Sequence, residues 1–149
     1  LSWLLDNGHE GPLIAMGRSL GSASVLELAA HYGNQIDGLV IESGFAYASP
    51  LFELLGINME VLGLREEEGF SHLEKIRRFD KPTLIIHAEQ DHIIPFSEGQ
   101  ALYEASPAGG KKLLMIPDAN HNDIFLRGMG EYLAAIKDLS NEVSSKIER

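Results

Sequence analysis

The chain has 149 residues, 44% of them hydrophobic and 23% charged, which is a typical size and balance for one folded domain with an apolar core. A formal net charge of −10 repels phosphate backbones and anionic lipid surfaces, so nucleic acid is not an expected partner. The chain contains no cysteine, which excludes disulfide bonds and thiolate sites, and it has no apolar run near the roughly 20 residues that a membrane-spanning helix needs.

The first part of the chain predicts strands that alternate with helices. It opens with the end of a helix, which Gly8 terminates. A strand is predicted over residues 13–16, a helix over 20–32 and a second strand over 39–41. The second strand is continuously apolar rather than alternating, which is typical of a strand that is buried on both faces of a parallel sheet.

The pattern loosens over residues 44–80, where proline and glycine favour short helices over one long helix. We expect a lid-like insertion here that covers an apolar pocket, although the same side chains could simply complete the core. Its apolar side chains are Phe45, Tyr47, Leu51, Phe52, Leu54, Leu55, Ile57, Met59, Leu62 and Leu64. The acidic run 66–68 reads as a solvated face, and Ser71 with Glu74 fits a capping box for a short helix that ends near Phe79.

The remaining elements continue the alternation. A strand is predicted over residues 83–87, followed by a helix that begins with a capping box at Ser97 and runs through Tyr103. A further strand is predicted over 112–116, and a last helix over 122–139 with an interruption at 128–130. Strands that alternate with helices in this way predict an α/β fold, with a parallel sheet and helices on both of its faces.

The sequence GRSLG, residues 17–21, lies between the first predicted strand and the first long helix. In that context a G-x-S-x-G pattern predicts a nucleophile elbow, in which glycines allow a sharp turn and the Ser19 hydroxyl is exposed above the sheet. The backbone N–H of Leu20 would then point at an oxyanion formed on the substrate. The alternative is that Ser19 only caps the following helix.

Each loop that follows a predicted strand carries a residue able to do chemistry. These residues are Ser19, Glu42, Asp91 and His121. Because ligands of open parallel sheets bind at the carboxyl ends of the strands, these four loops are expected to form one site. A serine hydroxyl needs a histidine to accept its proton, and the histidine needs a carboxylate to orient it. The order Ser19, Asp91, His121 matches the triad order of one particular scaffold.

These motifs resemble those of the α/β-hydrolase superfamily. The elbow 17–21, the acid loop 86–95 (IHAEQDHIIP) and the histidine loop 117–123 (PDANHND) match the family in order and in their place on the elements. The resemblance covers the C-terminal part of that fold, without its N-terminal strands. Within the family the chain is similar to prolyl-oligopeptidase-related serine hydrolases, to acyl-protein thioesterase-like proteins and to Bem46-like proteins.

The resemblance implies a serine hydrolase that cleaves carboxylic esters or thioesters through an acyl-enzyme intermediate, with no cofactor and no metal. It gives Ser19 the role of nucleophile, His121 that of general base and then acid, and Asp91 that of orienting carboxylate. Glu42 and Asp123 remain alternatives for the carboxylate, although Asp123 also suits the N-terminus of the last helix. Candidate residues for substrate binding are Arg18, Phe45, Tyr47, Leu51 and His92.

The remaining polar residues give weaker expectations. His87 lies in a buried strand pattern and is expected to be a core histidine, whereas His9, His31 and His72 are expected at the surface or in turns. The six histidines lack the spacing of metal ligands. Arg18 could contact a carboxylate, contact a substrate anion, or simply pack.

The missing N-terminal strands have three expected consequences. The loop after the third family strand supplies a second oxyanion donor, so this chain is expected to hold only half of the oxyanion hole. The strand 13–16 becomes an apolar edge, which we expect to pair with a second copy of the chain or with an N-terminal part of the protein. Any targeting segment would also lie in that part, and the cytoplasm is the expected location because a chain without cysteine suits a reducing compartment.

Two rival functions stay open on the sequence. The chain could be a truncated, non-catalytic hydrolase-like module that serves as a binding scaffold, or it could be a serine peptidase of the same superfamily.

Overall fold

The computed structural model describes residues 1–58, 60–63, 65 and 70–147. The predictions made for Met59, Leu64 and the acidic run 66–68 lie outside these residues.

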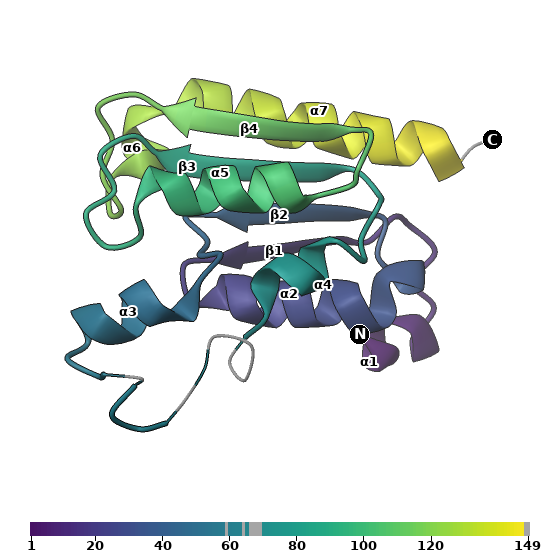
Figure 1. Ribbon diagram of the computed structural model, residues 1–149. Helices are drawn as coiled ribbons and strands as arrows, with labels where there is room; N and C mark the ends of the chain where they lie inside the picture. The colour runs from purple at the N-terminus through teal and green to yellow at the C-terminus, as the bar shows by residue number, and fades with distance from the viewer. Residues whose placement is uncertain (59, 64, 66–69, 148–149) are drawn as a thin grey trace.

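Four parallel strands form one sheet, in the order β1-β2-β3-β4 (Figure 1). The strands are β1 Ile14–Arg18, β2 Gly38–Glu42, β3 Thr83–Ala88 and β4 Lys111–Ile116. Each overlaps an apolar run of the sequence, and β2 and β3 are buried along their whole length. The parallel sheet predicted from the continuous apolar runs is confirmed.

Helices connect the strands and cover both faces of the sheet (Figure 1). They are α1 Ser2–Asp6, α2 Gly21–Tyr32, α3 Ala48–Leu54, α4 His72–Ile76, α5 Phe96–Ala105, α6 Ile124–Arg127 and α7 Met129–Ile147, with a short 3-10 helix η1 at Gly33–Gln35. The expected interruption of the last helix is confirmed, because α6 ends and α7 begins on either side of Gly128.

Both predicted capping boxes are wrong. Ser71 precedes α4 with a left-handed backbone, φ 48°, whereas a capping serine has an extended one. Ser97 lies inside α5, which begins at Phe96 after Pro95. Proline has a fixed φ and no N–H, so it suits the start of a helix without a serine cap.

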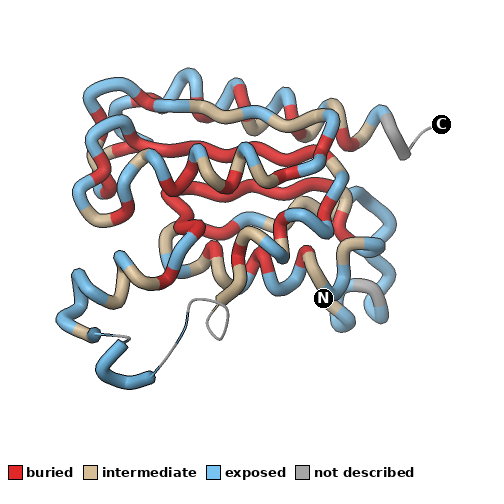
Figure 2. The backbone as a smooth tube through the Cα atoms, in the orientation of Figure 1, coloured by how far each residue is buried: buried red, intermediate tan, exposed pale blue. Residues whose placement is uncertain are grey.

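The side chains of the two central strands alternate between two apolar clusters. Leu39 and Ile41 of β2 pack with α2, α4 and α5 on one face, whereas Val40 packs with α7 on the other. Figure 2 shows the buried strands in the middle of the molecule, with the exposed sides of the helices around them. The core therefore fixes the strands, and with them the points at which the loops at their carboxyl ends begin.

The strand β1 forms one edge of the described sheet, as expected, and its Met16 is 51% exposed. What pairs with this edge stays a prediction.

Helix α3 lies beyond the carboxyl end of β1 and away from the sheet (Figure 1), and Leu54, Leu55 and Leu62 of this region are exposed. Within the part of the chain that the structure describes, no helix has the length and apolar character needed to cross a membrane.

Candidate active site

Ser19 stands on a tight turn between β1 and α2. Its backbone is left-handed, φ 51°, a conformation that is costly for a residue with a side chain and is found where the fold requires it. Glycine is required at position 17, two residues before Ser19, because a Cβ there would meet the Gly21 carbonyl and lie 2.7 Å from Val25 Cγ1. A Cβ at Gly21 would meet open space, so only the first glycine of the motif is sterically necessary. The Leu20 residue begins the α-helical backbone directly after the turn.

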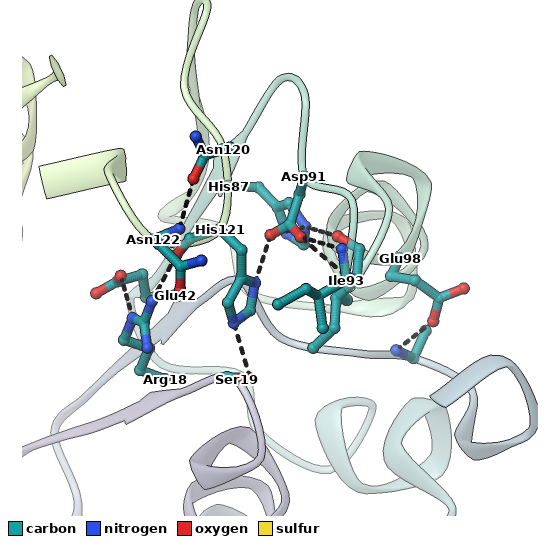
Figure 3. Close-up of polar contacts among 12 residues, drawn as sticks. Arg18, Ser19, Glu42, His87, Asp91, Ile93, Glu98, Asn120, His121 and Asn122 are labelled. Carbon is teal, nitrogen blue, oxygen red and sulfur yellow. Dashed lines mark hydrogen bonds and ion pairs between the residues drawn. The ribbon is translucent and has the colours of Figure 1, made fainter. Parts of the chain in front are cut away.

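The histidine loop and the acid loop bring their side chains to Ser19 (Figure 3). His121 Nε2 is 3.1 Å from Ser19 Oγ, and His121 Nδ1 is 2.8 Å from Asp91 Oδ2. An ionised carboxylate only accepts hydrogen bonds, so the proton is assigned to Nδ1, and Nε2 is left to accept the serine proton. Three residues from three separate loops therefore form one hydrogen-bonded chain.

The carboxylate of Asp91 is held on both of its oxygens. Oδ1 accepts hydrogen bonds from the backbone N–H groups of Ile93 and Ile94, at 3.0 and 2.9 Å. Burial alone would raise the pKa of Asp91, but the donors at Ile94, His121 and Ile93 outweigh it and hold the pKa below its ordinary value. The ring of His87 lies behind it, with Nε2 3.7 Å from Oδ2 and hydrogen-bonded to the Ile94 carbonyl at 2.8 Å. Asp91 is therefore kept ionised and fixed in orientation.

Glu42, the first alternative for the carboxylate, faces other partners. Its Oε1 accepts a hydrogen bond from Arg18 Nε at 2.9 Å, and its Oε2 accepts one from the Tyr132 hydroxyl at 2.6 Å. Burial, followed by the hydrogen bond to Glu42, raises the pKa of Tyr132. Arg18 also donates to the backbone carbonyl of His121. Of the outcomes expected for Arg18, contact with a carboxylate is the one that the structure shows.

Asp123, the second alternative, shapes the loop. Its Oδ1 accepts a hydrogen bond from the Asn120 N–H at 2.7 Å, and its Oδ2 pairs with Arg127 Nε at 2.7 Å. Asn120 in turn accepts a hydrogen bond from the Asn122 N–H at 2.8 Å, which makes an Asx turn around His121. Asp123 stands directly before α6, as the sequence suggested.

The acid loop also supports the histidine loop, a feature that the sequence analysis missed. Glu89 Oε2 accepts a hydrogen bond from the Asp118 N–H, and the Gln90 N–H donates to the Ala119 carbonyl, both at 2.9 Å. The Asn-His-Asn run could have indicated the Asx turn from the sequence. The contacts of Glu89 and Gln90 could not have been found that way, because they join residues 29 positions apart.

The other histidines divide between core and surface. His87 is fully buried, as expected, and burial lowers its pKa although the hydrogen bond to Ile94 opposes the shift. The expectation for His72 is wrong, since this side chain is 1% exposed and its Nδ1 lies 2.6 Å from the Phe45 carbonyl. Its place after a loop and before a short helix looked like a surface position, but the ring packs into an aromatic cluster.

The candidate substrate-binding residues differ in what they can offer. Phe45 is only 1% exposed, because it packs against Phe70 and His72, so in this conformation its ring has no free surface for a substrate. Tyr47 is 42% exposed and lines a small hollow of about 170 Å³ beside α4. Leu51 is half-buried and His92 is exposed. Their roles in substrate binding stay predictions, as does that of Arg18.

Among the residues that the structure describes, no group of three His, Cys, Asp or Glu side chains is placed to hold a metal ion.

The sequence is similar to known hydrolase-domain proteins. It is 30% identical over 135 residues to alpha/beta hydrolase domain-containing protein 17C of Homo sapiens, a match that covers 88% of this chain and 37% of that protein. The protein of the same name from Xenopus tropicalis is also 30% identical over 135 residues, with 39% of its length covered. No protein-family model matches. The fold, compared with solved structures, agrees: the esterase domain of a Rhodothermus marinus protein superposes with a TM-score of 0.71.

The chain belongs to the α/β-hydrolase superfamily. It spans about two fifths of the length of the curated relatives it matches. The Rhodothermus match has 23% sequence identity and covers 95% of this chain and 65% of the other. A Paleococcus ferrophilus monoacylglycerol lipase has a TM-score of 0.70 at 20% identity, covering 95% of this α/β-hydrolase chain and 72% of the lipase. The family resemblance read from the three motifs is therefore confirmed.

Proposed function

We propose that this chain carries the active site of a serine hydrolase that cleaves carboxylic esters or thioesters. The observation that carries the proposal is the continuous contact from Asp91 through His121 to Ser19, at 2.8 and 3.1 Å. The left-handed backbone of Ser19 adds weight, because strain of this kind is maintained where an exposed nucleophile needs it. The esterases and the lipase among the structural neighbours favour the same class of reaction by analogy of fold.

In the proposed acylation, Ser19 Oγ forms a bond to the carbonyl carbon of the substrate while its proton passes to His121 Nε2. The carbonyl electron pair moves to the oxygen and makes a tetrahedral oxyanion. When that intermediate collapses, the bond to the leaving alkoxide or thiolate breaks, and His121 gives the leaving group its proton. Water then repeats these steps on the acyl-enzyme, releasing the carboxylic acid and restoring Ser19.

Two neighbouring groups assist this cycle in the proposal. Asp91 holds the ring of His121 with its proton on Nδ1 and stabilises the imidazolium that forms in each step. The backbone N–H of Leu20, at the start of α2, donates a hydrogen bond to the oxyanion, and the positive end of the helix dipole favours negative charge there.

The acyl group, in this proposal, approaches from the side of residues 44–80, which we retain as the lid-like insertion of a single domain. Tyr47, Leu51 and His92 are the candidates to contact it. Phe45 supports that side from within the core, because it packs with Ala48 and Ile94.

The first test is the release of p-nitrophenol from a short-chain p-nitrophenyl ester, together with labelling by a fluorophosphonate. We expect a burst and a covalent label on this chain, and we expect both to be lost in Ser19→Ala. In the label, Ser19 Oγ forms a bond to phosphorus as the P–F bond breaks, so labelling reports an activated serine without turnover.

A peptide p-nitroanilide, run in parallel, separates esterase from peptidase activity. Faster turnover of the anilide than of the ester would favour the peptidase reading. A folded chain that neither labels nor shows a burst would overturn the proposal and favour a non-catalytic binding module.

A further inference from the structure

We propose that Arg18 and Glu42 are positioning residues that hold the histidine loop against the nucleophile elbow. The inference deepens the function proposed above and rests on it. Arg18 precedes the nucleophile in the sequence, and Glu42 is the last residue of β2. Neither side chain belongs to the Ser19–His121–Asp91 chain of hydrogen bonds, yet together they reach both of the loops that carry Ser19 and His121 (Figure 3).

The guanidinium of Arg18 makes the bridge. Its Nε donates to Glu42 Oε1 at 2.9 Å, and one of its terminal nitrogens donates to the backbone carbonyl of His121, a residue 103 positions further along the chain. A guanidinium is planar and presents its donors in a fixed fork. Once Glu42 fixes the plane of that fork, the position of the second donor, and with it the His121 carbonyl, is also set.

Glu42 is itself held by hydrogen bonds to its backbone and to its side chain. Its backbone carbonyl accepts a hydrogen bond from the Ser19 N–H at 2.9 Å, so the same residue holds the nucleophile directly. Arg18 and Glu42 also pair in register between β1 and β2. The Tyr132 hydroxyl of α7 donates to the second carboxylate oxygen at 2.6 Å, and Glu42 is 5% exposed. The carboxylate therefore has little freedom to rotate.

The position of His121 matters because its ring must face Asp91 and Ser19 at the same time. The bond to Asp91 fixes one end of the ring, but it leaves the backbone of the loop free to shift. Arg18 restrains that backbone at the residue that carries the ring. A misplacement on the order of 1 Å in such a site can cost roughly 100-fold in rate, so a restraint of this kind affects catalysis without touching the substrate.

The first experiment measures the fluorophosphonate labelling of Arg18→Lys and Arg18→Met. Lysine keeps a positive charge near the buried Glu42 but lacks the planar fork that serves two acceptors, and methionine removes both donors. We expect the maximal labelling rate to fall roughly 10- to 100-fold in both variants, with little change in the reagent concentration that gives half of that rate. Lys112→Met is the matched control, because it removes one cation from an exposed ion pair with Asp138 and should label like the wild type.

The second experiment reads the loop directly and does not need an active enzyme. Amide hydrogen exchange of residues 118–122 should rise on the order of 10-fold in Arg18→Lys and Arg18→Met, while the amides of β3 keep their protection. Glu42→Gln should raise exchange in the same loop, and combining it with Arg18→Met should add little, because the two residues act as one unit.

The outcomes separate this inference from the proposed function. Unchanged exchange of residues 118–122 in the Arg18 variants would overturn the positioning role, whether or not the chain labels. Labelling at the wild-type rate in Arg18→Lys would overturn it as well. A wild-type chain that does not label, but whose loop loosens in these variants, would retain the bridge as inferred and reject the hydrolase proposal alone.

Discussion

Two buried carboxylates, Glu42 and Asp91, lie at the carboxyl ends of neighbouring strands and contact different kinds of partner. Glu42 ends β2 and faces the Arg18 guanidinium and the Tyr132 hydroxyl. Asp91 follows β3 and faces the imidazole of His121. Position in the fold made both of them candidates for the triad. The partner distinguishes them, because only an imidazole can take up and return a proton near neutral pH.

The two carboxylates are also held in place by different parts of the fold. Asp91 is held by the N–H groups of its own loop, at Ile93 and Ile94, so its orientation is largely a local matter. Glu42 is held by side chains from β1 and α7, so its orientation depends on how distant elements pack. The surroundings of Asp91 suit a carboxylate that orients a histidine, and those of Glu42 suit a carboxylate that holds neighbouring elements in place.

The largest expected effect distinguishes the two carboxylates by activity. Asp91→Asn should lower kcat about 10⁴-fold, the loss known for this change in the trypsin triad, because an amide no longer holds His121 in the tautomer that accepts the serine proton. Glu42→Gln should lower kcat by less than about 100-fold, since it disturbs only the position of the loop. Steady-state hydrolysis of a p-nitrophenyl ester measures both.

Equal losses in the two variants would contradict the division of roles. A larger loss in Glu42→Gln than in Asp91→Asn would assign the triad carboxylate to Glu42. The fold of each variant is checked by its thermal unfolding midpoint.

The second prediction concerns packing behind Asp91. A Cβ on Gly99 of α5 would lie 2.5 Å from Nδ1 of the fully buried His87, whose ring cannot move aside. Gly99→Ala should therefore lower the free energy of unfolding by about 1–3 kcal/mol. Gly130→Ala is the control, because a Cβ there meets open space, and it should raise that free energy by about 0.4–1 kcal/mol. Urea unfolding followed by circular dichroism measures both, and an unchanged midpoint in Gly99→Ala would show that the site behind Asp91 is loosely packed.

The smallest expected effect is a pH dependence of the free energy of unfolding that comes from His87, the residue behind Asp91. Burial lowers the pKa of His87 from its ordinary 6.5, so below pH 6.5 the unfolded chain binds a proton that the folded chain does not. Stability from this group is complete above pH 6.5 and is lost as the pH falls from there toward the lower folded-state pKa, by at most about 1.4 kcal/mol per pH unit.

Replacing the histidine should remove this dependence. We expect His87→Gln to show a shallower fall in the free energy of unfolding between pH 7 and 5 than the wild type does. Tyr132→Phe, on the Glu42 side, should keep the wild-type slope, because burial and then Glu42 raise the pKa of Tyr132 still further from this range. Identical slopes for His87→Gln and the wild type would show that His87 carries no part of the acid sensitivity.

Much of the fold was predictable from local patterns. The apolar runs identified all four strands to within two residues at each end. The signal is clearest for β2 and β3, because a strand that is buried on both faces must be apolar throughout. The helix caps were not predictable, although Ser71 and Ser97 both matched the capping-box pattern. Ser71 instead adopts a left-handed turn before α4. Ser97 lies inside α5, which begins after Pro95. The burial of His72 was missed for a similar reason, because its aromatic partners are distant or lie in irregular loops.

The sequence by itself determined the class of fold and the order of the residues Ser19, Asp91 and His121, because apolar periodicity and a short motif act over a few neighbouring positions. It left Glu42 and Asp91 as rivals, and it left the role of Arg18 open. Only the tertiary structure shows which groups these three side chains contact. The contacts involved join strands and loops 24 to 103 residues apart, and no local pattern fixes which side chains meet across a sheet edge.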